Sequence, residues 1–351
     1  MTMQLPQPRG PVTAALRQAL TGAPHELPGH LADMARATGD PLDDEDLQLT
    51  LHICYELHYR GFDDVDEGWE WQPSLLALRQ AAESRFETAL RRLVPPPAPV
   101  PPQEVPRALT ALVQADDGPE LSRYLAGRAT IAQFREFVTH RSIYHLREAD
   151  PHTWAVPRLA GRPKAALVEI QADEYGGGRA ERMHAELFRT TMRELGLDTR
   201  YGAHLDAVPA ATLATNNLMS LFGLHRRLLA AILGHLAVFE MTSSLPNRRY
   251  GNGLRRLGGS ADATRFYDEH VEADAVHEQI AAHDLCGAFC AAQPPSRRAE
   301  QTSLVLFGAA CALALDGRFA GHLVRRWADG RSSLRDQSRS HGRSLVGALG
   351  A

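Results

Sequence analysis

The chain has 351 residues, of which 44% are hydrophobic and 23% are charged, and its formal net charge is -4. This composition allows a large core and two domains, and interspersed charges of both signs argue against nucleic acid as a partner. No apolar run reaches membrane-spanning length and the N-terminus lacks a signal peptide, so we expect no membrane partner.

A proline-rich stretch at residues 94–106 marks the clearest boundary in the chain. Prolines remove backbone donors and favour an extended spacer, so we predict a linker there. It separates an N-terminal helical region, residues 1–93, from a bundle at residues 107–330, which a polar tail at 331–351 follows. In the first region, apolar spacing predicts helices at 47–57 and 75–93, although 47–53 also fits the alternation of a strand.

Almost every segment after the linker has the apolar spacing of an α-helix. Thr130 caps the first of these helices, Pro163 suits the first turn of the second, and Gly196 suits its C-cap. The predicted helices cover residues 130–148, 163–195, 211–222, 224–240, 263–290 and 298–327. Since useful strand-like alternation is absent there, we predict an all-α fold, a helical bundle whose interior can host cofactors.

Two of the four cysteines, Cys286 and Cys290, lie one helical turn apart. We expect them to pack as small apolar residues. Together with Cys54 and Cys311 they are too few and too scattered for a disulfide framework. The expected location is therefore a reducing cytoplasm.

His270, Asp274 and His277 form the most informative motif of the chain. At α-helical spacing the two histidines are nearly two turns apart, with Asp274 between them on the same face. Two imidazoles and a carboxylate on one rigid helix suit a divalent metal such as iron, manganese or zinc. The same residue types also occur on solvated helix faces, and polar neighbours such as Asp268 and Glu272 leave that alternative open.

An earlier segment offers a second set of the same ligand types, Glu174 and His184. Ten residues apart on one helix, they would lie on adjoining parts of one face, roughly 80° apart. Between them stand Gly176–Gly178, which are costly inside a helix and indicate a loosened helix or a close approach to its backbone. The alternative is a surface helix with a chance Glu and His around a flexible joint.

A third donor comes from the helix that Thr130 caps. Glu148 lies one turn beyond Tyr144, on a line that descends from Phe137, and this places Glu148 inward near the end of its helix. Spacing alone does not choose between Glu148 and three competitors on the same helix, which are Glu136, His140 and His145.

From about residue 125 to 330, the chain resembles the haem-oxygenase-like diiron oxidases, a superfamily of iron-containing redox enzymes. The resemblance is carried by Glu148, by Glu174 with His184 ten residues later, and by His270-x-x-x-Asp274-x-x-His277. In that family one helix supplies a Glu, a second supplies a Glu and a His, and a later one supplies His, Asp and His. The resemblance implies that these six residues hold two Fe(II) ions and that O2 is the co-substrate.

The function implied by this resemblance is that of a non-haem diiron oxidase or oxygenase acting on a small metabolite in specialised metabolism. Family reactions include N-hydroxylation, desaturation and C–C cleavage of amino-acid-derived or fatty-acid-like substrates. The alternatives are a mononuclear metal enzyme and a non-catalytic bundle that binds a metal or a metabolite. Since helical N-terminal additions in the family are associated with dimerisation, we expect a homodimer.

Four further polar residues are candidates for the substrate pocket, namely Glu240, Tyr144, Tyr175 and Asn217. Glu240 interrupts an apolar run at residues 236–241, where a buried carboxylate needs a partner. It would bind a substrate amine, support the site, or mark the emergence of its helix into solvent. Tyr175 suits a hydrogen bond to a ligand carboxylate, and simple packing is the alternative.

Overall fold

The computed structural model describes residues 3–34 and 39–336, and residues 34 and 273–275 by their backbone alone. The regular elements of this described part are helices, and an isolated bridge joins Met3 to Phe62. The predicted all-α fold is confirmed. The α-helices and one π-helix, η8, are α1 Pro11–Leu20, α2 His30–Met34, α3 Glu45–Glu56, α4 Pro73–Leu93, α5 Val105–Gln114, α6 Leu121–Gly127, α7 Ile131–His145, α8 Asp150–Thr153, α9 Gly161–Glu174, α10 His184–Glu194, α11 Ala210–Leu224, α12 Leu229–Arg256, α13 Ala261–Gln279, η8 Ile280–Gly287, α14 Ala288–Ala291 and α15 Pro295–Ala328.

Capping residues and prolines mark the ends of the N-terminal helices. Asp44 caps α3 by accepting hydrogen bonds from the backbone of Asp46 and Leu47. Residues 47–56 lie in α3 and are all buried, so the helix, and not the alternative strand, forms there. Pro73 stands in the first turn of α4, and the helix ends at Leu93, just before the prolines.

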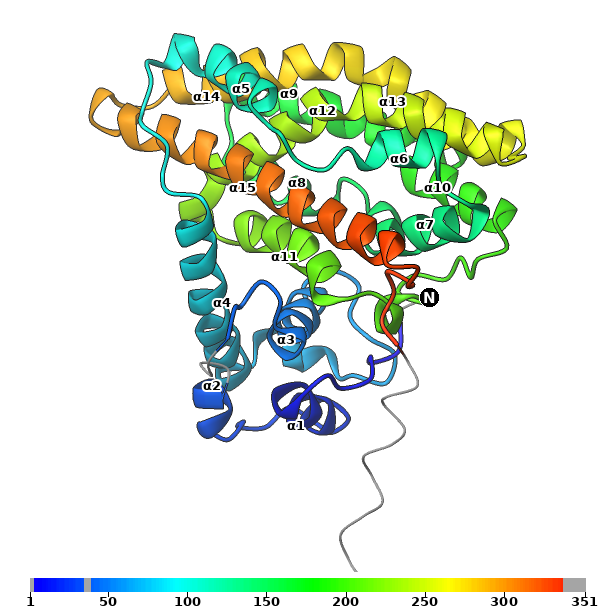
Figure 1. The fold of residues 1–351 in the computed structure, drawn as a ribbon. Helices are drawn as coiled ribbons and strands as arrows, with labels where there is room; N and C mark the ends of the chain where they lie inside the picture. Colours follow the sequence, from blue (N-terminus) through cyan, green and yellow to red (C-terminus); the bar gives the residue numbers. More distant parts are fainter. Residues whose placement is uncertain (1–2, 35–38, 337–351) are drawn as a thin grey trace, which may run out of the picture.

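Helices α1, α2 and α3 lie below α11, with α3 packed against it, and α4 runs upright beside them (Figure 1). Most of the remaining helices lie above α11. One continuous hydrophobic core includes Leu51 of α3, Leu213 of α11 and Leu233 of α12. The stretch 94–106 lies against α15, because Val100 donates its backbone N–H to Thr302 and Ser303 donates to the Pro97 carbonyl. The division of the chain into domains at this stretch stays a prediction.

The centre of the bundle is the crossing of the two longest helices, α12 and α15. A Cβ atom at Gly234 would stand 1.9 Å from the Val305 carbonyl oxygen, and one at Gly308 would stand 2.0 Å from that of Ala231. Glycine at both positions therefore lets the two backbones approach closely. By length and composition alone, both helices could cross a membrane, although the sequence was expected to hold no apolar run of that length. However, 61% of the most apolar stretch of each helix is buried inside the protein.

Several predicted helices differ from the observed ones where local geometry intervenes. The helix predicted at 163–195 is two helices, α9 and α10, separated by 3₁₀ turns. The one predicted at 263–290 changes into η8 after Gln279, and the one predicted at 224–240 continues to Arg256. Helix α7 ends at His145, so Glu148 lies in the turn that follows rather than in the helix.

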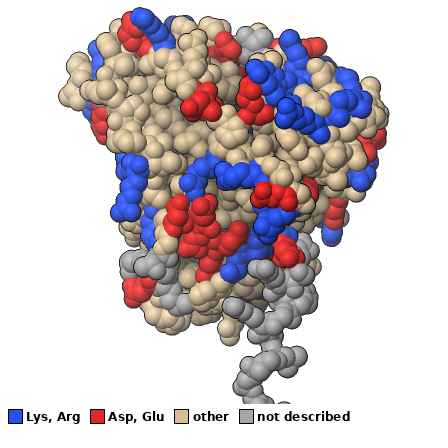
Figure 2. Space-filling model, in the orientation of Figure 1, with Lys and Arg blue, Asp and Glu red and all other residues tan. Residues whose placement is uncertain are grey.

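Acidic and basic side chains both gather in patches over the face displayed in Figure 2. One example is Arg318, which pairs with both Asp40 and Asp43. Such mixed charges fit the near-neutral balance of the sequence. The absence of nucleic acid and membrane partners stays a prediction.

Candidate metal centre

Four buried side chains from separate segments converge inside the bundle. Each contributes one donor atom, and these atoms all lie within 4.8 Å of one another. Glutamate oxygens and imidazole nitrogens are ligands that iron, manganese and zinc accept. The four residues are Glu148, Glu174, His184 and His270.

Glu148 is held in place by the turn after α7. Ala149 next to it has a positive φ of 72°, which is unusual for a residue with a Cβ atom. His145 Nδ1 donates to Glu148 Oε1 at 2.7 Å, and Oε2 is buried without a hydrogen-bond partner. Burial raises the pKa of Glu148, but the attraction of His145 and hydrogen bonds from His145 and His270 outweigh it and lower that pKa overall.

Glu174 and His184 meet although they belong to two helices. Glu174 is the last residue of α9 and His184 is the first of α10. The three glycines Gly176–Gly178 all have positive φ, from 60° to 79°, and they turn the chain back on itself. His184 Nδ1 thus comes within 3.0 Å of Glu174 Oε2, and neither atom has a partner in hydrogen-bonding geometry. The structure thus brings these two residues together, but the single continuous helix predicted for them is wrong.

His270 presents one ring nitrogen to the site because the other is occupied. Its Nδ1 donates to the Phe266 carbonyl at 2.8 Å, one turn earlier in α13. Nε2 then lies 3.6 Å from Glu148 Oε1. A backbone carbonyl that fixes the ring in this way is a common support of metal-binding histidines.

A second group of donors lies beside the first and consists of Glu174, Glu240 and His277. His277 Nδ1 stands 3.4 Å from Glu240 Oε2, while its Nε2 donates to Asp173 Oδ2 at 2.9 Å. Burial lowers the pKa of His277, but the close contact with Glu240 and the negative charge of Glu240 outweigh burial and raise that pKa to about 9. A cation is thus already favoured at this position.

Glu174 belongs to both donor groups. A carboxylate has two oxygens, so a single glutamate between two sets of ligands suits two adjacent metal ions. Four buried donor atoms in these groups have no hydrogen-bond partner, namely Glu148 Oε2, Glu174 Oε2, His184 Nδ1 and His277 Nδ1. Such atoms are expected where side chains bind a metal ion instead of a hydrogen-bond donor or acceptor.

The remaining predicted ligand, Asp274, has its side chain outside the described residues. Of the three competitors of Glu148, His145 supports it directly. The other two bind the segment around Ser333. Glu136 accepts hydrogen bonds from Ser333 and Trp327. His140 forms hydrogen bonds with Thr212 and Ser333. These contacts fasten the described start of the predicted tail onto the bundle.

Spacing did not identify Glu240 as a candidate metal donor, and it was predicted only as a pocket residue. Its side chain is 7% exposed and lies in the run of apolar residues of α12. The interruption of that run was the available signal, because an isolated buried carboxylate is unfavourable without a cation or hydrogen bonds.

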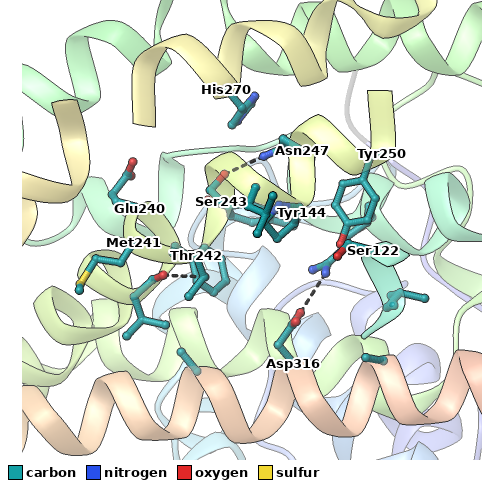
Figure 3. Close-up of a pocket in the computed structure, with 18 of the residues that line it drawn as sticks. Ser122, Tyr144, Glu240, Met241, Thr242, Ser243, Asn247, Tyr250, His270 and Asp316 are labelled. Carbon is teal, nitrogen blue, oxygen red and sulfur yellow. Dashed lines mark hydrogen bonds and ion pairs between the residues drawn. The ribbon is translucent and has the colours of Figure 1, made fainter. Parts of the chain in front are cut away.

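A cavity of about 540 Å³ opens onto the donor groups. Figure 3 shows Glu240 and Met241 on one side of it and Tyr250 and Ser122 on the other, with Tyr144 between them. Of the predicted pocket residues, Glu240 and Tyr144 line this cavity.

The other two predicted pocket residues lie elsewhere. Tyr175 bonds through its hydroxyl to Asp150 and Thr153, and it does not line the cavity. Asn217 donates to the backbone and side-chain oxygens of Gln48, so it joins the bundle to α3. The polar groups of both residues form hydrogen bonds outside the cavity, so the prediction that they line the substrate pocket is wrong.

Comparison with known proteins agrees with this geometry. The sequence model of a protein family described as "Iron-containing redox enzyme" matches residues 135–317, just over half of the chain. All the described donors lie within these bounds. A "Nitrosourea synthase" of Streptomyces achromogenes subsp. streptozoticus is 28% identical over 142 residues, which is 40% of this chain and 30% of that protein. The chain thus matches less than a third of the length of this curated relative.

Proposed function

The chain belongs to the iron-containing redox enzyme family, and from this premise we propose that it is a non-haem diiron oxidase or oxygenase using O2. The observation that carries the proposal is the position of Glu174 in both donor groups. Glu148, His184 and His270 would hold one iron ion with it, and Glu240 and His277 would hold the other. Asp274 lies on α13, as His270 and His277 do, and it would be a further ligand.

The ligand set suits ferrous iron in charge as well as in type. Four carboxylates, counting Asp274, and three neutral imidazoles would balance two Fe(II) ions. Two bound iron ions would supply the electrons for oxygen chemistry. The protein's own contribution is to keep these donors buried, to fix His270 and His277 through Phe266 and Asp173, and to seat the substrate in the adjoining cavity.

A small organic molecule, amino-acid-derived or fatty-acid-like, is the proposed substrate. A volume of about 540 Å³ is within the usual range for such ligands. Tyr144 and Asn247 offer polar contacts in the cavity wall. N-hydroxylation, desaturation and C–C cleavage are the proposed reaction types. The name of the Streptomyces relative describes a nitrogen-containing product, which favours chemistry at nitrogen.

A cytoplasmic location and a role in specialised metabolism complete the proposal. The four cysteines are free and buried, as suits a reducing compartment. A homodimer remains our expectation for the assembly, and sedimentation of the purified protein would test it.

Anaerobic titration with ferrous iron, followed by exposure to O2, tests the proposed function. We expect about two irons per chain and oxygen uptake that requires them. A plateau at about one iron that is unaffected by Glu174→Ala would support the mononuclear alternative. An absence of iron binding would favour the non-catalytic bundle and contradict the proposal.

A further inference from the structure

Two histidines that are not donors of either metal group form a buried pair behind the cavity. His152 of α8 and His235 of α12 are each 1% exposed, and His152 Nε2 lies 3.2 Å from His235 Nδ1. At this distance the two rings share one proton in a hydrogen bond. His152 lines the metal-site cavity, and its Nδ1 is buried without a hydrogen-bond partner.

His235 in turn lines a second, much smaller cavity of about 20 Å³. This volume fits one water molecule. Asn216 supplies a polar contact for such a water, because its Oδ1 is buried without a partner while its amide nitrogen donates to the Thr212 carbonyl. The second ring nitrogen of His235 supplies another contact, since Nδ1 is used by His152.

The small cavity also borders a side chain that reaches the surface. Arg141 and Asp316 form an ion pair at 2.9 Å and line both cavities. The Asp316 side chain is 49% exposed. Polar groups therefore continue from the surface at Asp316, through the small cavity and the two imidazoles, to the metal-site cavity.

We propose that His152 and His235 form a proton relay that delivers protons from the small cavity to the metal-site cavity. This rests on the proposed function, because oxygen reduction is the reaction that needs the protons. Reduction of O2 to hydrogen peroxide takes up two electrons and two protons. Two bound ferrous ions would supply the electrons, and the relay would deliver the protons at the wall of the cavity that His152 forms.

Each transfer leaves both imidazoles neutral. A proton arrives at Nε2 of His235, the Nδ1 proton of His235 passes to Nε2 of His152, and the Nδ1 proton of His152 enters the cavity. Each ring gains one proton and loses one. The starting tautomers return when each imidazole gives up its Nε2 proton to water in the cavity that it lines and takes one up on Nδ1. Burial favours these neutral forms, since it lowers the pKa of His235 well below its usual value and, against attraction from Glu174 and Glu148, that of His152 to about 4.

Two conservative variants interrupt the relay at different points. His235→Asn keeps a polar group near Nδ1 but loses the nitrogen that faces the small cavity. His152→Asn keeps a polar group near the metal-site cavity but loses the link to His235. A matched control is His52→Asn, since His52 is 3% exposed and lines neither cavity.

The test compares oxygen uptake by the three variants after anaerobic loading with ferrous iron, in H2O and in D2O. The relay predicts full iron loading, uptake slowed roughly tenfold or more in both relay variants, and a larger solvent isotope effect. In a fourth variant, His152→Ala, added imidazole should restore uptake. His52→Asn should match the wild type. Wild-type rates in both fully loaded relay variants would overturn the relay while leaving the diiron proposal intact.

A second readout needs no iron. In the iron-free protein labelled with ¹⁵N-histidine, the relay predicts coupling between His152 Nε2 and His235 Nδ1 through their shared proton. It also predicts that His235→Asn, unlike His52→Asn, shifts the ring resonances of His152. Absence of that coupling in the wild type would overturn the relay even if no variant folds. Failure of the wild type to take up iron or oxygen would refute the relay and the proposed function together.

Discussion

Glu56 of α3 accepts a hydrogen bond from Arg147 at 3.1 Å, between the N-terminal helices and the bundle. The two side chains are 0% and 1% exposed. Tyr201 donates to both oxygens of Glu56 at 2.9 Å. Because Arg147 directly precedes Glu148, this contact ties the N-terminal region to the turn that carries a candidate iron ligand.

Glu56→Ala should destabilise the protein and weaken iron binding. It leaves the Arg147 guanidinium buried without its carboxylate, which costs about 3–5 kcal/mol in such pairs. Urea unfolding of the iron-free protein and ferrous titration measure the two effects. The control is Asp198→Ala, because the pair of Asp198 with Arg200 is exposed and should contribute little. Equal stability of the two variants would show that the buried pair does not hold this joint.

Gly176→Ala should weaken iron binding more than Gly177→Ala does. Both glycines have positive φ, 70° and 60°, so alanine strains either position by roughly 1–2 kcal/mol. Only at Gly176 would the new Cβ also meet backbone, 2.6 Å from the Met183 nitrogen, next to His184. The readout is the dissociation constant for Fe(II) in each variant. The same constant in both would mean that the close approach at Gly176 does not set the position of His184.

Glu240→Ala should reduce the iron content from about two ions per chain to about one. It removes a donor of the second group alone, whereas Glu174→Ala removes the donor common to both and should weaken both sites. Glu169→Ala, which removes an exposed carboxylate from α9, serves as the control. Iron analysis after gel filtration gives the stoichiometry. Two tightly bound irons in Glu240→Ala would exclude Glu240 as a ligand.

Acidification below pH 6.5 should destabilise the iron-free protein. Burial holds the pKa values of His52, His140 and His235 well below 6.5. The unfolded chain therefore binds more protons there, and the free energy of unfolding falls by up to about 1.4 kcal/mol per pH unit for each histidine. His277, with its pKa raised to about 9, contributes stability that is complete below 6.5 and is lost as the pH rises towards 9.

Urea unfolding between pH 7 and pH 5.5 checks this trend. His52→Asn should remove about one third of the slope that the three histidines produce. A free energy of unfolding that does not change over this range would contradict the neutral burial of these rings.

The fold class and most of the donor set could be predicted from the sequence, because helical periodicity and residue type are local properties. Helix boundaries were less accessible. Spacing alone placed Glu174 and His184 on one helix, whereas three consecutive residues with positive φ bring them together across a break. The two side chains still lie close together, because the turn after Glu174 brings His184 back to it.

The assignment of Glu240 depended on tertiary packing. Its own helix shows only that a carboxylate interrupts an apolar run, and the approach of His277 from α13 identifies a candidate second site. For the same reason the sequence did not exclude Asn217, whose partner Gln48 is 169 residues away.

The most direct test of the two-iron centre is a crystal structure of the protein loaded anaerobically with Fe(II), with anomalous diffraction measured at the iron edge. We predict two iron peaks about 3.5–4 Å apart, one on each side of the Glu174 carboxylate, with His270 at one and His277 at the other. A single peak, or peaks away from Glu174, would contradict the diiron account.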